Sequence, residues 1–174
     1  MSRLAWHFLR DNGELRDGTK PPPDGEWLSV DGDIRACSWG LHASERILDA
    51  LGFAPGSVIC RVEVRGDIRE HGRPPDKLVA RERRILWRLD AEIGGRVLRE
   101  FARWAALQVI DLWDAPAVVR EYLETGDESL RYAARSAAGP AAGDAAWDAA
   151  RDAAWAAQNA KLEALVTTAA GRTS

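Results

Sequence analysis

The sequence has few of the residues and segments that mark several classes of protein. It contains only two cysteines, Cys37 and Cys60, in 174 residues; this excludes a disulfide framework and favours reduced thiols in a cytoplasmic protein. No apolar run approaches the roughly 18 residues of a membrane span, so we expect no membrane contact. The N-terminal stretch 1–13 lacks a long apolar core and a small-residue cleavage site, so it is not predicted to be a signal peptide.

The sequence also has no large excess of charge of one sign. It carries 24 basic and 27 acidic side chains, with a net charge of -3. This balance excludes a strongly basic nucleic-acid binder and a highly charged disordered chain. With 46% hydrophobic residues, the chain suits one globular domain with a helical appendage. Direct binding of nucleic acid is therefore not expected, whereas a basic protein partner is compatible with the charge.

The first third of the sequence predicts short strands and turns. Strands are expected at Leu4–Leu9, Trp27–Val30 and Ile34–Ser38, and residues 16–25 form a loop. Ser44 is a candidate N-cap for a helix at Glu45–Leu51 that ends at Gly52. This arrangement would place His42 in a strand-to-helix turn.

The clearest strand is Val58–Gly66, in which Cys60, Val62 and Val64 alternate with charged residues. That pattern is typical of a strand with one buried face, so we expect Cys60 to be a core residue. Lys77–Arg81 is predicted to be a strand that turns into a helix near Glu82. A loop is expected between the two strands, over His71–Asp76.

From residue 96 onward the spacing of apolar residues predicts helices. Leu98, Phe101, Ala105, Val109 and Leu112 follow a helical period. Asp114 is a candidate cap for a second helix that ends at Gly126, and Asp127 for a third, which together form a helical hairpin. The fold class predicted is α+β, with a mixed domain at 1–95 and a helical region at 96–170.

The tail contains a four-residue repeat rich in alanine and tryptophan, which predicts one helix over Asp144–Val166. Trp147, Arg151 and Trp155 fall on one stripe of that helix. Two readings stay open. The helix packs on its own domain, or the stripe is a binding surface for a protein partner or a second copy of the chain.

Several motifs resemble a family of uncharacterised phage and prophage proteins. The blocks that carry the resemblance are Cys37, Gly40-Leu41-His42-Ala43-Ser44, Asp49-Ala50-Leu51, Ala54-Pro55-Gly56, Cys60-Arg61-Val62-Glu63-Val64-Arg65-Gly66 and Lys77-Leu78-Val79-Ala80-Arg81-Glu82-Arg83. Some members carry Asp-Ala-Ala-Trp repeats of varying number, which implies a spacer or binding surface. The resemblance implies a phage or mobile-element accessory protein that binds another protein, with a host system as the target. The alanine-rich helices are also loosely similar to bacterial immunity-type proteins.

An enzyme remains the alternative. A histidine on an early strand, the Gly-Leu-His-Ala-Ser block, a helix and a valine-rich strand resemble the layout of ADP-ribosyltransferases. That resemblance implies NAD as cofactor, with His7 bonding the nicotinamide ribose, His42 stacking the nicotinamide and Glu82 polarising the ribose hydroxyl. No metal site is predicted, because Cys37, His42, Cys60 and His71 lack the paired spacing of structural zinc ligands. Without the enzyme reading, no cofactor is expected.

Overall fold

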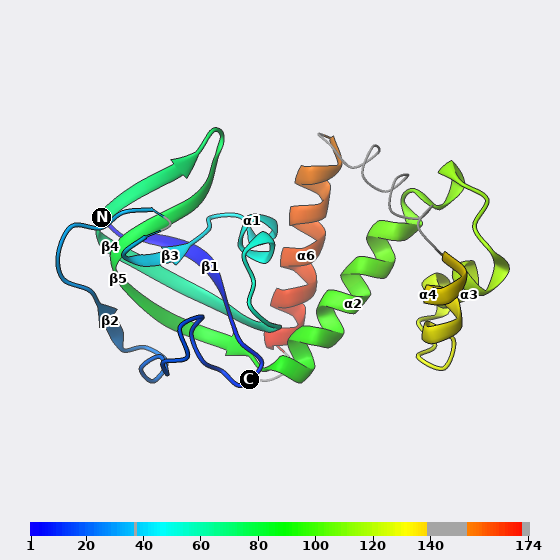
Figure 1. The fold of residues 1–174 in the computed structure, drawn as a ribbon, viewed down its shortest axis with the longest axis horizontal. Coiled ribbons are helices and arrows are strands. Elements are labelled where there is room, and N and C mark those ends of the chain that lie inside the picture. The colour runs from blue at the N-terminus through cyan, green and yellow to red at the C-terminus, as the bar shows by residue number, and fades with distance from the viewer. Residues whose placement is uncertain (37, 139–152, 172–174) are drawn as a thin grey trace. The chain divides into compact units, whose positions relative to one another are not determined.

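The computed structural model describes residues 1–36, 38–138 and 153–171. Its contacts divide the chain into two compact units. The first contains residues 1–96 and the end of the chain from Glu163, and the second contains residues 97–162. A five-stranded antiparallel sheet occupies the N-terminal part and helices follow it (Figure 1). The α+β fold class predicted from the sequence is confirmed.

The sheet is built around one long hairpin. Strand β4 (Val58–Gly72) pairs with β5 (Pro75–Leu89) over nearly its whole length, and β1 (Arg3–Leu9) pairs with the other edge of β4. The edge of β5 opposite β4 pairs with two short strands that lie end to end, β2 (Trp27–Ser29) and β3 (Leu41–Ala43). Each of Trp6 and Ser44 donates its backbone N–H to the carbonyl of the other, which joins the end of β3 to β1. Strands β1, β4, β5 and β3 therefore close into a ring.

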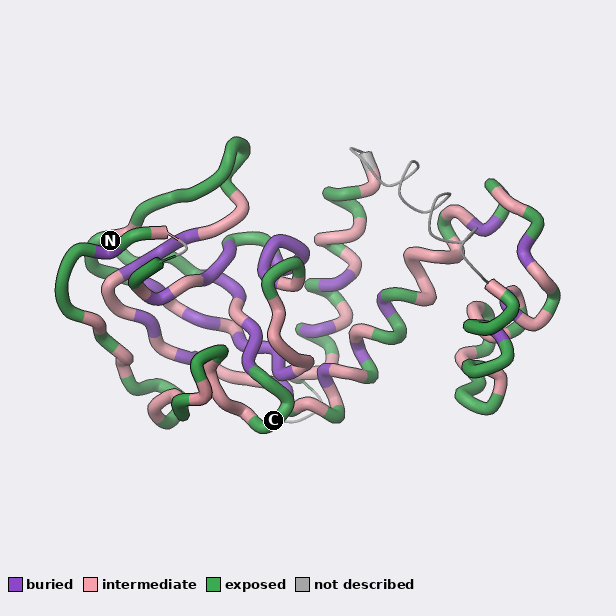
Figure 2. Tube along the Cα trace, in the orientation of Figure 1, coloured by how far each residue is buried: buried purple, intermediate pink, exposed green. Residues whose placement is uncertain are grey.

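Alternation along β4 places its apolar residues in the core, as predicted. Cys60, Val62 and Val64 are fully buried. Arg61 and Glu63 are half-buried instead of exposed. The guanidinium of Arg61 lies 4.5 Å from the centre of the Trp6 ring, and the carboxylate of Glu63 is 2.7 Å from Arg84. Figure 2 shows that buried residues concentrate in the strands and the neighbouring helix α1.

Three sequence predictions in this unit are wrong. Residues 34–36 and 38 do not form the expected strand, because the backbones of Arg35 and Trp39 bond to each other, and position 37 lies outside the described residues. Helix α1 spans Ile47–Gly52, and Ser44 does not cap it, because its backbone is paired with Trp6. The expected helix near Glu82 is absent, and β5 continues to Leu89. Strand pairing on both edges of β5 outweighs the helical spacing of its leucine and isoleucine residues.

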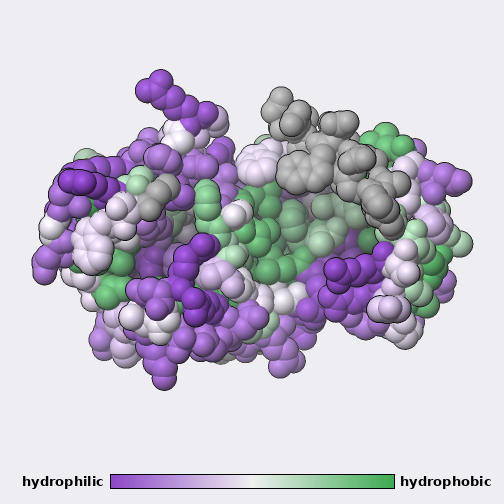
Figure 3. Space-filling view, viewed as in Figure 1, coloured by the Kyte–Doolittle hydropathy of each residue, from purple (hydrophilic) through white to green (hydrophobic). Residues whose placement is uncertain are grey.

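Helix α2 (Ala91–Leu107) begins five residues before the predicted start, with Asp90 accepting a hydrogen bond from the N–H of Ile93 at 2.8 Å. A Cβ at Gly94 would lie 2.0 Å from the carbonyl oxygen of Ser57, so only glycine lets this helix approach the start of β4. The hydrophilic surface of the first unit dominates the face seen on the left of Figure 3.

The second unit is helical. After α2 come a short 3-10 helix, η1 (Ile110–Leu112), and the helices α3 (Ala117–Thr125) and α4 (Arg131–Ala138). Gly126 ends α3 in a left-handed conformation, and Asp127 accepts a hydrogen bond from Ser129 in the turn that follows. The predicted hairpin is confirmed, but Asp114 makes no capping bond to α3. Helix α6 (Ala153–Gly171) confirms the tail helix where it is described. No described helix is both long and apolar enough to cross a membrane.

Candidate functional site

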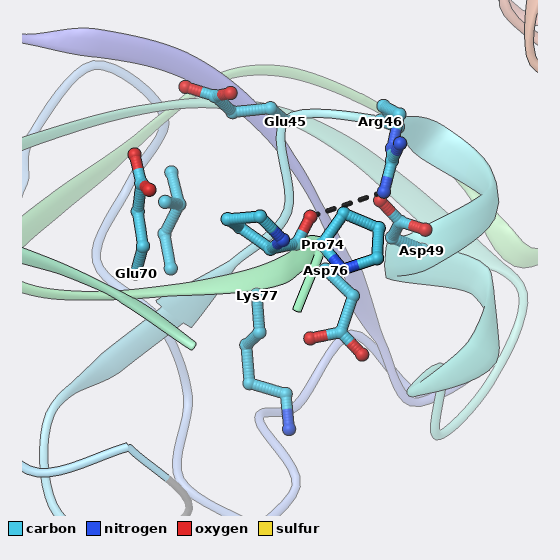
Figure 4. A pocket seen from close by; sticks show the side chains of 9 residues that line it. Glu45, Arg46, Asp49, Glu70, Pro74, Asp76 and Lys77 are labelled. Atoms are coloured by element: carbon cyan, nitrogen blue, oxygen red, sulfur yellow. Dashed lines mark hydrogen bonds and ion pairs between the residues drawn. The ribbon is translucent and has the colours of Figure 1, made fainter. Parts of the chain in front are cut away.

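A cavity of about 260 Å³ lies where the tip of the β4–β5 hairpin meets the start of α1 (Figure 4). It draws its residues from two segments of the chain that are distant in sequence, 45–49 and 70–78. Four of the lining side chains are acidic, two are basic and three are apolar: Glu45, Asp49, Glu70 and Asp76; Arg46 and Lys77; Pro74, Pro75 and Leu78. The cavity is therefore acidic on balance and has an apolar part.

The hairpin turn shapes one wall of the cavity. Gly72 has a φ of 99°, and a Cβ there would lie 2.7 Å from Oδ1 of Asp76 and 2.9 Å from the carbonyl oxygen of Pro74. Only glycine permits this close reversal. The turn brings Pro74 between Glu70 on one side and Arg46 with Asp49 on the other, as Figure 4 shows.

Two arginines tie the acidic side chains together. Nε of Arg46 lies 2.6 Å from the carboxylate of Asp49, and Nη2 donates to the carbonyl of Pro75 at 3.1 Å. Arg3, from β1, lies 2.6 Å from Glu70 and 3.4 Å from Glu45. The segment that leads into helix α1 is thereby bonded to the hairpin tip beside the cavity.

The acidic side chains are not fully compensated. Burial raises the pKa of Asp49, and the neighbouring charge of Asp76 raises it further, although the ion pair with Arg46 acts in the opposite direction. Oδ1 of Asp76 is buried and accepts no hydrogen bond from the described residues. Burying a carboxylate oxygen without a hydrogen-bond donor costs free energy of folding. The cavity therefore favours an added positive charge.

The three candidate catalytic residues from the sequence lie elsewhere. His7 is on β1, on the same face of the strand as Ala5 and Leu9, which belong to the core cluster. Its Nε2 is buried and makes no hydrogen bond to a described residue. Burial holds the pKa of His7 well below 6.5, and the positive charge of Arg83 and the nearby His42 and Arg16 lower it further. His7 is thus a neutral imidazole.

His42 lies within strand β3, not in a strand-to-helix turn as predicted. Burial lowers its pKa, with Lys77 and Arg83 adding to that effect, while a hydrogen bond to the backbone of Gly40 raises it. Gly40 has a φ of 128°, and a Cβ there would lie 2.4 Å from a methyl group of Val79. The glycine before His42 is therefore required by close packing of β3 on β5.

Glu82 lies on β5 and forms an ion pair with Arg65 at 2.7 Å. Its neighbour Arg83 is opposite Val64 in the register, and Val64 shares the core face with the residues that flank His7. Because successive strand residues face opposite ways, Glu82 and His7 lie on opposite faces of the sheet. His42 alternates with Ala43, another residue of that core cluster, and so also faces away from His7. The structure does not bring the three side chains to one face.

The predicted binding stripe is only partly described. Trp147 and Arg151 lie outside the described residues, while Trp155 is on α6 and 39% exposed. Cys60 is fully buried, and burial raises its pKa to about 12, which suits a core thiol and not a nucleophile. Among the described residues, no three His, Cys, Asp or Glu side chains gather closely enough to hold a metal ion.

Comparison with known protein families finds a match over part of the chain. Residues 10–93 match the family described as a domain of unknown function, DUF7666. The DUF7666 segment contains every residue that lines the acidic cavity, together with His42 and Glu82. His7 and Trp155 lie outside it. No curated protein and no solved structure matches the chain.

Sequence reasoning missed the acidic cavity. Its carboxylates stand at positions 45, 49, 70 and 76, and nothing in the sequence indicates that these segments meet. One signal was available. The run Gly72-Arg73-Pro74-Pro75-Asp76 between two strand patterns is typical of a tight turn, where binding residues are often presented.

Proposed function

We propose that the first unit is a protein-binding module whose acidic cavity receives a lysine or arginine side chain of its partner. The observation that carries this proposal is the uncompensated charge of the cavity. Four carboxylates line the cavity against two basic side chains, with Arg3 as a third basic group bonded to Glu45 and Glu70, and one buried carboxylate oxygen has no donor among the described residues. A cationic side chain would supply both the missing charge and the missing donor.

The lining matches both parts of a long basic side chain. Lysine and arginine have an apolar stem and a charged end, and the stem favours apolar surroundings. Pro74, Pro75 and Leu78 provide apolar surface for the stem. Glu45 and Glu70 have side chains that are 56% and 47% exposed, so they are accessible to the charged end. A cavity of about 260 Å³ accepts a single side chain.

Binding a cation would also favour the ionised form of Asp49. Its pKa is raised because burial and the charge of Asp76 disfavour the ionised form. A positive charge brought beside these groups favours ionisation. The partner would therefore bind more tightly as pH rises through the titration of Asp49.

The setting we propose is a phage or mobile element, with a host protein as the partner. The resemblance to phage and prophage proteins and the tail of alanine and tryptophan repeats support this setting. The exposed Trp155 supports a second contact region on the tail. A cytoplasmic location follows from the same proposal.

The ADP-ribosyltransferase-like reading is the alternative proposal. One observation favours it, namely a buried imidazole nitrogen at His7 on the first strand that makes no hydrogen bond to a described residue. It predicts that NAD binds at millimolar concentration, measured by calorimetry, and that His7→Ala or His42→Ala removes the binding. The binding-module proposal predicts no heat of NAD binding from either the unchanged protein or the variants.

A charged-peptide titration tests the binding module. The probe is a labelled octapeptide with alternating arginine and glycine, and its counterpart has glutamate in place of arginine. Fluorescence anisotropy at low salt should show binding of the basic peptide alone. The double variant Glu45→Gln/Glu70→Gln should weaken it at least about fivefold, because each exposed ion pair contributes up to about 1 kcal/mol.

The matched control is Asp67→Asn, which removes a carboxylate from β4 outside the cavity, where Asp67 lies 2.8 Å from Arg69. This variant should retain binding within twofold. Equal loss in the control and the double variant would show that the peptide responds to overall charge, and the cavity would then not be the binding site.

A further inference from the structure

The second unit contains a separate hollow of about 300 Å³ between the end of α2 and the helices α3 and α4. Nine of its lining residues are apolar or aromatic and two are arginines: Ala106, Val109, Ile110, Trp113, Val119, Tyr122, Leu123, Ala134 and Ala138; Arg131 and Arg135. Among the residues that the structure describes, no acidic side chain lines it. Hydrophobic atoms reach the surface in the region of α3 and α4 (Figure 3).

The hollow exists because the apolar side chains of α3 are large, whereas those of α4 are small. Helix α3 contributes Val119, Tyr122 and Leu123, whereas α4 contributes only Ala134 and Ala138 as apolar residues. Alanine is too short to fill the space between helices, and close packing is the rule in protein interiors. The unit therefore has apolar walls around a space that its own described side chains leave open.

Two positive charges stand beside this space. Arg131 and Arg135 are one helical turn apart, so both lie on the face of α4 that lines the hollow. Arg131 is 3.5 Å from Glu128, and its side chain is 53% exposed. Arg135 is also exposed, and no ion pair joins it to another described residue. An anion at this place would meet two guanidinium groups.

We propose that this hollow binds a small amphipathic carboxylate, with its alkyl tail among the apolar side chains and its carboxylate at Arg131 and Arg135. Small-molecule pockets have volumes from about 300 Å³ upward, mostly apolar walls and a few polar groups that fix orientation. Arginine pairs with carboxylates by charge-assisted hydrogen bonds. The size, the apolar lining and the two arginines, of which Arg135 forms no ion pair with a described residue, together favour this class of ligand.

Three probes of equal chain length test the proposal in the full-length protein: octanoate, 1-octanol and octylammonium. Calorimetry should show octanoate binding at least tenfold more tightly than octanol, and octylammonium binding more weakly than either. The double variant Arg131→Gln/Arg135→Gln should reduce octanoate to the affinity of octanol and leave octanol unchanged. Arg120→Gln is the control, because Arg120 is on α3 outside the hollow and faces Asp111 at 3.2 Å.

A second variant tests the apolar part. Ala134→Leu should fill the hollow and lower the affinity for octanoate and octanol alike, with circular dichroism as the check on folding. Octanoate binding that neither Ala134→Leu nor the arginine pair alters would overturn the proposal, as would equal affinity for octanoate and octanol. If octanoate fails to bind and a helical peptide with leucine and glutamate one turn apart binds instead, the hollow is a docking site for protein.

Discussion

The guanidinium of Arg83 donates a hydrogen bond to the backbone carbonyl of His42, which ties β5 to β3. Arg83 is only 4% exposed, and no carboxylate of a described residue forms an ion pair with it. Burial lowers its pKa to about 10. A charge held in the interior by a carbonyl alone is stabilised weakly compared with its cost of desolvation.

Two substitutions separate the charge of Arg83 from its volume. Arg83→Met keeps most of the volume and removes the buried charge, so the free energy of unfolding should change by less than about 1 kcal/mol. Arg83→Ala leaves a cavity and should cost about 2–4 kcal/mol. Denaturant unfolding measures both. A loss with methionine as large as with alanine would show that the charge itself is needed.

The core strand gives a second prediction. Val62 is fully buried on β4, so Val62→Asp places an unpaired carboxylate in the core and should cost several kcal/mol. Thermal unfolding followed by circular dichroism should show a protein unfolded at room temperature or with a much lower melting temperature. Leu4→Asp is the control, because Leu4 is 54% exposed on β1. An unchanged melting temperature for Val62→Asp would contradict the buried face of β4.

The third prediction concerns acid stability. The pKa of His7 lies well below 6.5 in the folded protein, so below pH 6.5 the unfolded state binds more protons than the folded state. The contribution of His7 to the free energy of unfolding is fully present above pH 6.5. It is lost as pH falls toward the folded pKa, by up to about 1.4 kcal/mol per pH unit. His7→Gln should flatten that dependence, measured by denaturant unfolding between pH 7 and 4.5.

The tail gives the fourth prediction. Trp155 is 39% exposed, and a large exposed indole favours contact with another surface. If a second copy of the chain supplies that surface, changing Trp147 and Trp155 to alanine should lower the weight-average mass in sedimentation velocity experiments. The melting temperature of the sheet should move little. A protein that is monomeric before and after the change would leave only a different partner for the tail.

The strands could be predicted where one face alone is buried. In β4, Cys60, Val62 and Val64 alternate with charged residues, and the periodicity is visible in the sequence. In β5, Leu78, Val79 and Ala80 are all buried, because both faces are covered. That run interrupts the alternation, so spacing at three and four residues gave a false helix at Glu82.

The prediction of a helix cap at Ser44 was wrong, because the backbone of this residue pairs with a strand instead. Ser44 has the side chain of a helix cap, yet its N–H and carbonyl are committed to Trp6. Asp90 does precede its helix and bonds to Ile93, so the signal was present in the sequence but was not recognised. The acidic cavity could not be predicted, because Glu45 and Glu70 are distant in sequence and are brought together beside Arg3 only by the pairing of the strands.

The base of the β4–β5 hairpin lies in the core, whereas its tip lines the acidic cavity. Near its base, Cys60, Val62 and Ile85 are sealed in the interior, so substitutions there act on folding. At its tip, Glu70 and Asp76 line the cavity, and Glu70 is largely open to solvent. If the cavity binds a partner as proposed, divergence at the tip would change which groups it accepts while the interior stays constant, and exchanging a few residues around one turn would redirect the same scaffold to new partners.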